Sequence, residues 1–120
     1  MGVQAKIGVG GRDPESINDV LHALFWKDPE LAGKAGDFLE YVKSWSRTET
    51  PYRVSQWESY CEKSGLTQSQ YHNILRRLRR AGLIDKKYSK QACDHHLFLS
   101  GRFSSQLGAL ASIWDEFTTL

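Results

Sequence analysis

The sequence predicts one mainly α-helical domain with a single small β-hairpin. Apolar residues recur at helical spacing in several separate segments, whereas Leu83 to Ser100 forms two extended runs separated by a polar stretch. The chain has 120 residues, of which 40% are hydrophobic and 25% charged. This is an ordinary globular composition, and the length suffices for one hydrophobic core but not for two.

Composition also narrows the class of protein. The longest uncharged apolar runs are only a few residues, and the N-terminus lacks the pattern of a secretory signal. Cys61 and Cys93 cannot form the disulfide framework of a small secreted domain. We therefore expect a cytoplasmic protein with no membrane contact.

The N-terminal part divides into an arm and two helices. Residues 1–12 are glycine-rich and lack periodicity, so we expect a flexible arm followed by a single domain over residues 13–120. Asp13-Pro14 and Asp28-Pro29 each match an N-cap followed by proline at the first helical position. The apolar stripe of the first helix is Ile17, Val20, Leu21 and Leu24, and that of the second is Leu31, Ala35, Phe38, Leu39, Val42 and Trp45.

Two further helices are expected around a turn of three residues. A short extended segment, residues 52–54, precedes them. Gly65 ends the first helix and Gly82 ends the second, because glycine readily adopts the left-handed conformation found after helices. Each helix opens with a pair that fits a capping box, in which two side chains satisfy free backbone N–H groups. The pairs are Ser55 with Glu58 and Thr67 with Gln70.

The C-terminal part predicts a hairpin and a last helix. Leu83 to Tyr88 reads as a strand, Ser89 to Asp94 as a polar tip, and His95 to Ser100 as the returning strand. After Gly101, a helix over residues 104–118 is expected from an apolar stripe. The stripe consists of Leu107, Leu110, Ala111, Trp114 and Phe117.

Positive charge is concentrated between Thr67 and Lys90. This stretch contains seven lysines and arginines and one acid, Asp85, so it carries +6, whereas the whole chain carries only +2. The rest of the chain is therefore acidic, at −4. A charge run is often only a solvated face, but here it coincides with the second helix and the hairpin.

The order of these elements resembles the winged helix-turn-helix proteins of prokaryotic transcriptional regulators, of the MarR-like and ArsR-like kind. The residues that carry the resemblance are Val54-Ser55, Gly65-Leu66-Thr67-Gln68-Ser69, Ile74-Leu75-Arg76-Arg77-Leu78 and Arg80-Ala81-Gly82-Leu83-Ile84. Tyr60 and Tyr71 depart from it, since the pattern usually has aliphatic residues there. The resemblance implies a helix-turn-helix over residues 55–81, a wing over 83–100, and flanking N- and C-terminal helices. It also implies sequence-specific binding to double-stranded DNA and, with it, nucleoid association.

The second helix has separate apolar and polar faces. Its apolar face centres between Leu75 and Leu78, and the polar face opposite can enter the major groove as a recognition helix, residues 67–81. Base-reading candidates are Gln68, Ser69, His72, Asn73 and Arg76. Phosphate candidates are Thr67, Arg77, Arg79, Arg80 and, on the basic wing at residues 85–95, Lys86, Lys87 and Lys90. The arginines could instead solubilise the helix, and the lysines could protect a strand edge.

Other functions receive less support from the sequence. The acids have no histidine at a fixed spacing, so we expect no enzyme and no cofactor. Cys93, His95 and His96 lack the second ligand pair of a zinc site, so no metal is expected. A winged helix can also serve as a protein-interaction module or as an accessory domain in replication or RNA binding. No residue pattern identifies a small-molecule effector.

A homodimer is expected because both terminal helices carry apolar stripes that a small winged-helix core covers only in part. In the regulators that the sequence resembles, terminal helices pair about a two-fold axis. The alternative is a monomer in which both helices fold back on the domain. The interface candidates are Leu21, Leu24, Leu107, Leu110, Trp114 and Phe117.

Overall fold

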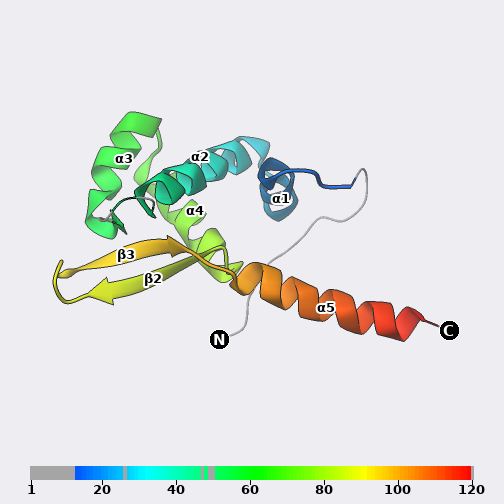
Figure 1. The fold of residues 1–120 in the computed structure, drawn as a ribbon. Coiled ribbons are helices and arrows are strands. Elements are labelled where there is room, and N and C mark those ends of the chain that lie inside the picture. The colour runs from blue at the N-terminus through cyan, green and yellow to red at the C-terminus, as the bar shows by residue number, and fades with distance from the viewer. Residues whose placement is uncertain (1–12, 26, 47, 49–50, 120) are drawn as a thin grey trace.

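The computed structural model describes residues 13–25, 27–46, 48 and 51–119. The described residues form five α-helices and a three-stranded antiparallel sheet, in the arrangement shown in Figure 1. The helices are α1 (Ile17–Leu24), α2 (Pro29–Ser46), α3 (Trp57–Ser64), α4 (Gln68–Arg80) and α5 (Arg102–Thr118). The strands are β1 (Tyr52–Arg53), β2 (Ile84–Ser89) and β3 (Asp94–Leu99), and a short 3₁₀ helix, Val54–Gln56, precedes α3. The predicted fold class is confirmed: mainly helical with a small sheet, consistent with a winged-helix-like fold. The arm predicted for residues 1–12 lies outside the described residues.

The sheet has the strand order β1-β3-β2. Strands β2 and β3 form the predicted hairpin, with Ile84 opposite Leu99 and Ser89 opposite Asp94. The hairpin tip is shorter than predicted, because Ser89 and Asp94 belong to the strands. Strand β1 pairs with β3, with Tyr52 opposite Leu97. The sequence predicts an extended segment there but not its partner, which lies 45 residues further along the chain.

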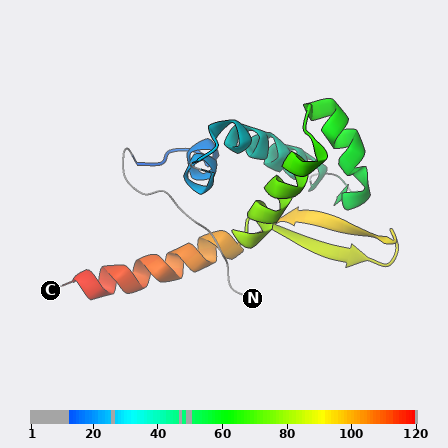
Figure 2. The ribbon, with the colours of Figure 1, turned by 180° about the vertical axis from the view of Figure 1, so that it is seen from behind.

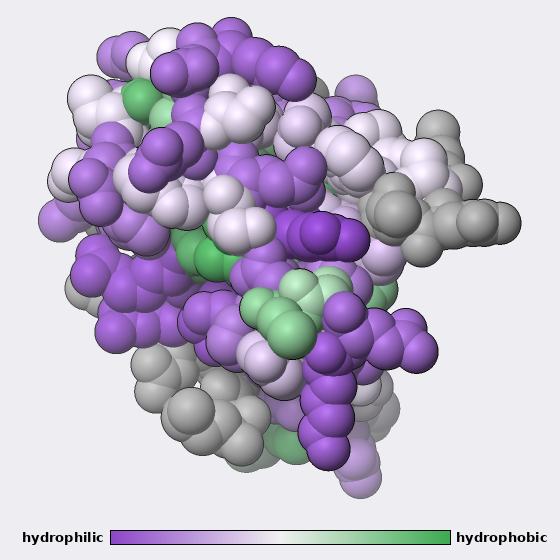
Figure 3. Space-filling model, turned by 90° about the vertical axis from the view of Figure 1, so that its left-hand side faces the viewer, coloured by the Kyte–Doolittle hydropathy of each residue, from purple (hydrophilic) through white to green (hydrophobic). Residues whose placement is uncertain are grey.

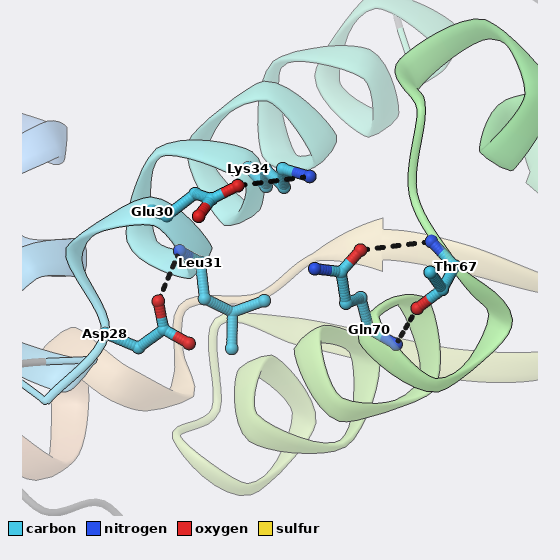
Figure 4. Close-up of polar contacts among 6 residues, drawn as sticks. All are labelled: Asp28, Glu30, Leu31, Lys34, Thr67 and Gln70. Atoms are coloured by element: carbon cyan, nitrogen blue, oxygen red, sulfur yellow. Dashed lines mark hydrogen bonds and ion pairs between the residues drawn. The ribbon is translucent and has the colours of Figure 1, made fainter.

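Two of the predicted helix starts are present (Figure 4). At the start of α2, the Asp28 carboxylate accepts a hydrogen bond from the Leu31 N–H at 3.0 Å. At α4, the Thr67 hydroxyl accepts from the Gln70 N–H, and the Gln70 side chain accepts from the Thr67 N–H, both at 3.1 Å. This is the predicted capping box, and it fixes the first turn of α4.

Two other predicted starts are wrong. Helix α1 begins at Ile17 rather than at Asp13-Pro14, because the Ser16 hydroxyl accepts the Asp19 N–H and caps the helix. The capping box of Ser55 and Glu58 does not form. Ser55 lies in the 3₁₀ helix, and its N–H donates to the Asp94 carboxylate on β3 at 3.3 Å. A long-range contact therefore replaces the local cap.

The core is built around an aromatic cluster. Phe38 of α2 meets the rings of Tyr52, Tyr60 and Tyr71 edge-on, with ring centroids 5.1–5.6 Å apart. The hydroxyls of Tyr52 and Tyr71 lie 2.8 Å apart and hydrogen-bond to each other inside the core. Ile84 and Leu97 are fully buried as well, so the sheet is joined to the same core.

The two terminal helices have different surroundings. Helix α1 packs against α2, and its Leu21 is fully buried. Helix α5 extends away from the body (Figures 1 and 2), and none of its described residues is fully buried. It starts at Arg102, two residues before the predicted start. The alternative in which both helices fold back on the domain holds for α1 but not for α5.

Candidate nucleic-acid interface

A single hollow collects much of the positive charge of the described chain. It lies between α4, the start of β2 and the start of α5, and its volume is about 1270 Å³. Five cationic side chains and one carboxylate line it, so its electrostatic potential is positive. We call it the basic hollow, and its lining residues are Ser69, His72, Asn73, Leu75, Arg76, Arg79, Arg80, Asp85, Lys86 and Arg102.

Helix α4 presents two distinct faces. Tyr71, Ile74 and Leu78 are at most 1% exposed and pack into the core. Arg76 and Arg80, which the sequence places on the opposite side, are exposed and line the basic hollow. The polar face of α4 is therefore accessible to a large ligand along the helix.

The base-reading candidates mostly gather in the basic hollow. Ser69, His72, Asn73 and Arg76 line it. The side-chain amide oxygen of Asn73 accepts a hydrogen bond from the Arg76 guanidinium at 3.2 Å. Gln68 is exposed in the first turn of α4 but does not line the hollow.

The phosphate candidates divide into two groups. Arg79, Arg80 and Lys86 line the basic hollow. The others lie elsewhere: Thr67 caps α4, Lys90 is exposed in the hairpin tip, and the Lys87 ammonium lies 5.7 Å from the centre of the Phe98 ring. The Arg77 guanidinium lies 4.9 Å over the Phe25 ring, so Arg77 covers apolar surface beside α1.

Sequence reasoning missed two residues of the basic hollow. The Arg102 guanidinium pairs with the Asp85 carboxylate at 2.8 Å and donates to the Ile84 carbonyl oxygen at 3.2 Å. The pair joins the first residue of α5 to β2. Asp85 is the single acid of the basic stretch, which is a signal for a paired charge, but its partner lies 17 residues away and could not be identified from spacing.

A second long-range polar contact joins the hairpin to the 3₁₀ helix that precedes α3. The Asp94 carboxylate at the start of β3 accepts hydrogen bonds from Ser55 and from the His95 N–H, and these bonds hold the pKa of the Asp94 carboxyl below its ordinary value.

The view onto α3 and the hairpin tip shows a largely hydrophilic surface (Figure 3). This end of the molecule is suited to water or to a polar partner.

The residues predicted to form a dimer interface differ in exposure between α1 and α5. Leu21 is fully buried in the chain's own core and Leu24 is partly buried against it, whereas Ile17 at the start of α1 is 51% exposed. Leu107 is partly buried, whereas Leu110, Trp114 and Phe117 are 63–76% exposed. Ile113, which the predicted stripe omits, is 67% exposed. The exposed apolar candidates therefore lie on α5 alone.

The cysteines and histidines do not form a metal centre in the described part of the chain, where no group of three potential ligands is found. His95 packs edge-on against Tyr88, and His96 against Phe98. Cys61 is buried, and burial raises the pKa of its thiol. Over the same residues, no helix is both long and apolar enough to cross a bilayer.

Comparison with known proteins identifies one family. The model of an archaeal family matches residues 12–119, which is most of the chain, and the protein belongs to that family. No curated protein and no solved structure gives a significant match.

Proposed function

Taking the chain as a member of this archaeal family, we propose that it binds double-stranded DNA sequence-specifically and regulates transcription in the cytoplasm, at the nucleoid. Helix α4 lies in the major groove, and the β2–β3 hairpin contacts the adjacent backbone. The observation that carries the proposal is the basic hollow, where the polar face of α4 and five cationic side chains converge. The resemblance to winged helix-turn-helix regulators supports the same assignment.

The polar face of α4 has the chemistry needed to read bases. Arginine donates two hydrogen bonds to guanine, and asparagine pairs with adenine through its amide. Asn73 and Arg76 lie one helical turn apart, both line the basic hollow, and their side chains hydrogen-bond to each other. We assign base reading to these two residues first, with Ser69 and His72 beside them.

The surrounding cations fit phosphate binding. Arg79, Arg80 and Lys86 line the rim of the same hollow. Arg102 also lines it, but its charge is partly neutralised by Asp85 at 2.8 Å. We therefore assign phosphate contacts to Arg79, Arg80 and Lys86, with Lys87 and Lys90 as contributors from the hairpin, and we leave Arg77 out because it covers Phe25.

We also propose that the protein binds DNA as a homodimer. Two copies related by a two-fold axis would place their α4 helices in successive major grooves, about 34 Å apart, and would favour a palindromic site. The exposed apolar residues of α5 supply the surface for such pairing. A footprint with two-fold symmetry on a selected site is the expected result.

The direct test is the salt dependence of DNA binding. Fluorescence anisotropy titrations of a labelled duplex between 50 and 200 mM salt should show a steep fall in affinity, because each neutralised phosphate contributes a slope of about −0.9 in log–log form. Arg76→Ala should weaken binding to the preferred site, whereas Lys43→Ala should not, because Lys43 is an exposed cation of α2 that does not line the basic hollow. A shallow slope in the wild type would instead favour a protein-interaction module.

A further inference from the structure

The apolar residues of α5 have the spacing of a coiled-coil seam. Phe103, Leu107, Leu110, Trp114 and Phe117 alternate in steps of four and three residues, which places them in one stripe along the helix. Leu110, Trp114 and Phe117 are 63%, 63% and 76% exposed. Ser105 and Ser112 lie on the side of α5 opposite the stripe, and Ile113, which is 67% exposed, widens the apolar surface along one flank.

The body of the protein holds α5 at its first residues and leaves the seam uncovered. Arg102 pairs with Asp85 and donates to the Ile84 carbonyl oxygen, and the Phe103 N–H donates to the Gly82 carbonyl oxygen at 3.1 Å. These bonds fix the direction in which α5 leaves the body (Figure 2). Farther along, Trp114 and Phe117 stack on each other with ring centroids 5.7 Å apart and remain open to solvent.

We propose that this seam binds the α5 helix of a second copy of the chain in antiparallel orientation. The proposal goes beyond pairing of both terminal helices, because α1 is already packed in the core of its own chain. It specifies that the partner is a second copy of the chain, that the pairing helix is α5, and that the two helices run antiparallel. It does not depend on DNA binding.

The charges of α5 favour the antiparallel direction. Its one cation, Arg102, is at the N-terminal end, and its two acids, Asp115 and Glu116, are near the C-terminal end. An antiparallel pair brings the acidic end of each helix toward the other chain's Arg79 and Arg80, which line the same hollow as Arg102 at the start of α5. A parallel pair would bring four carboxylates together at one end, where they repel.

The length of the helix also suits the proposed function. Helix α5 has 17 residues and is therefore about 25 Å long. In an antiparallel pair the two bodies lie at opposite ends, so their α4 helices are separated by a distance comparable to one turn of DNA, about 34 Å. Only this last consequence rests on the proposed function.

Sedimentation equilibrium of the full chain at micromolar concentration tests the surface. The wild type should have twice the 13.7 kDa mass of one chain, and Trp114→Glu/Phe117→Glu should have the single-chain mass. Ser105→Glu/Ser112→Glu adds two charges on the exposed side opposite the seam and should leave the dimer intact. A monomeric wild type, or a dimer that survives Trp114→Glu/Phe117→Glu, would overturn the proposal. The thermal transition of each variant checks folding, which should be preserved because neither aromatic side chain is in the core.

A distance measurement tests the direction. In a Cys93→Ser/Thr118→Cys chain, a spin label at residue 118 should lie about 20–30 Å from its copy in an antiparallel pair, given a rise of about 1.5 Å per residue. A parallel pair would bring the labels to about 10 Å, the spacing of packed helices, and would overturn the antiparallel assignment.

The Trp114→Glu/Phe117→Glu variant retains the basic hollow and should still bind a short duplex with a steep salt slope. Failure of DNA binding is thereby distinguished from failure of pairing.

Discussion

At the residue scale, the hydroxyls of Tyr52 and Tyr71 show how polar groups are accommodated in the core. The two rings come from β1 and α4, and their hydroxyls hydrogen-bond at 2.8 Å. A buried hydroxyl without a partner costs free energy, whereas a satisfied pair is nearly neutral. The two residues therefore depend on each other, which explains how tyrosine is tolerated at position 71, where the resemblance would place an aliphatic residue.

This mutual dependence can be measured. Tyr71→Phe leaves the Tyr52 hydroxyl buried without a partner and should lower the free energy of unfolding by about 1–3 kcal/mol. Tyr52→Phe/Tyr71→Phe removes both hydroxyls and should cost less than the sum of the two single changes. Urea unfolding of the four proteins gives the coupling. Strict additivity would show that the hydroxyls do not interact.

Stability at alkaline pH follows from the same cluster. Burial raises the pKa of Tyr60 and of Tyr71 to about 12, whereas an unfolded tyrosine ionises near 10. Above pH 10 the unfolded chain therefore binds fewer protons than the folded one, and stability falls through the interval from about 10 to 12. The slope is about 1.4 kcal/mol per pH unit for each tyrosine. Tyr60→Phe should make the fall of the urea midpoint less steep, and a midpoint that stays constant up to pH 11.5 would be inconsistent with these pKa values.

At the element scale, α4 combines a buried structural face with the proposed DNA-binding face. Leu78 is fully buried, so Leu78→Ala should lower the free energy of unfolding by about 2–5 kcal/mol. Arg76 is exposed, so Arg76→Ala should leave stability nearly unchanged and weaken binding at a preferred DNA site by about 1–3 kcal/mol. Thermal unfolding and anisotropy titration of both variants separate the two faces. A destabilised Arg76→Ala protein with normal DNA affinity would reverse the assignment.

The start of α4 depends on a local cap. Thr67→Ala removes the hydroxyl that accepts the Gln70 N–H and should cost about 0.5–2 kcal/mol of stability. Ser69→Ala is the matched control, because Ser69 is exposed in the same first turn and alanine favours the helix interior. Equal urea midpoints for Thr67→Ala and Ser69→Ala would show that the cap contributes nothing.

The sequence could predict the elements that depend on local contacts, but not those that depend on contacts between distant segments. The Thr67–Gln70 box and the turn at Gly65 depend on residues within one helical turn, and both are present as predicted. The predicted cap at Ser55 is absent because Asp94, 39 residues away, binds that backbone N–H instead. The pairing of β1 with β3 and the ion pair between Asp85 and Arg102 are also contacts between distant segments. The exposure of α5 could not be read from its stripe, since a buried helix and an unpartnered helix share the same periodicity.

At the scale of the whole molecule, the charge is divided between two regions. Residues 67–90 carry +6, and the rest of the chain carries −4. This division favours an orientation in which the hairpin and the polar face of α4 meet a polyanion. The near-neutral total therefore conceals a strongly basic surface.

The hairpin lysines should contribute to affinity without contributing to selectivity. Lys86→Gln/Lys87→Gln/Lys90→Gln should weaken binding to all duplexes by a similar factor and reduce the magnitude of the salt slope, because phosphates are the same in every sequence. Titrations of a preferred and an unrelated duplex at several salt concentrations provide the comparison. A changed preference between the duplexes with an unchanged slope would mean that the hairpin reads bases.

The most direct test of the proposed DNA-binding surface is a ¹H–¹⁵N spectrum of the labelled protein recorded during titration with a short duplex. Every described amide then reports whether its own surroundings change. Shifts should concentrate in the outward face of Gln68–Arg80 and in the hairpin Ile84–Leu99, while the amides of α2, which contributes no residue to the basic hollow, stay in place. Shifts centred on Pro29–Ser46, or a spectrum that does not change at saturating duplex, would contradict it.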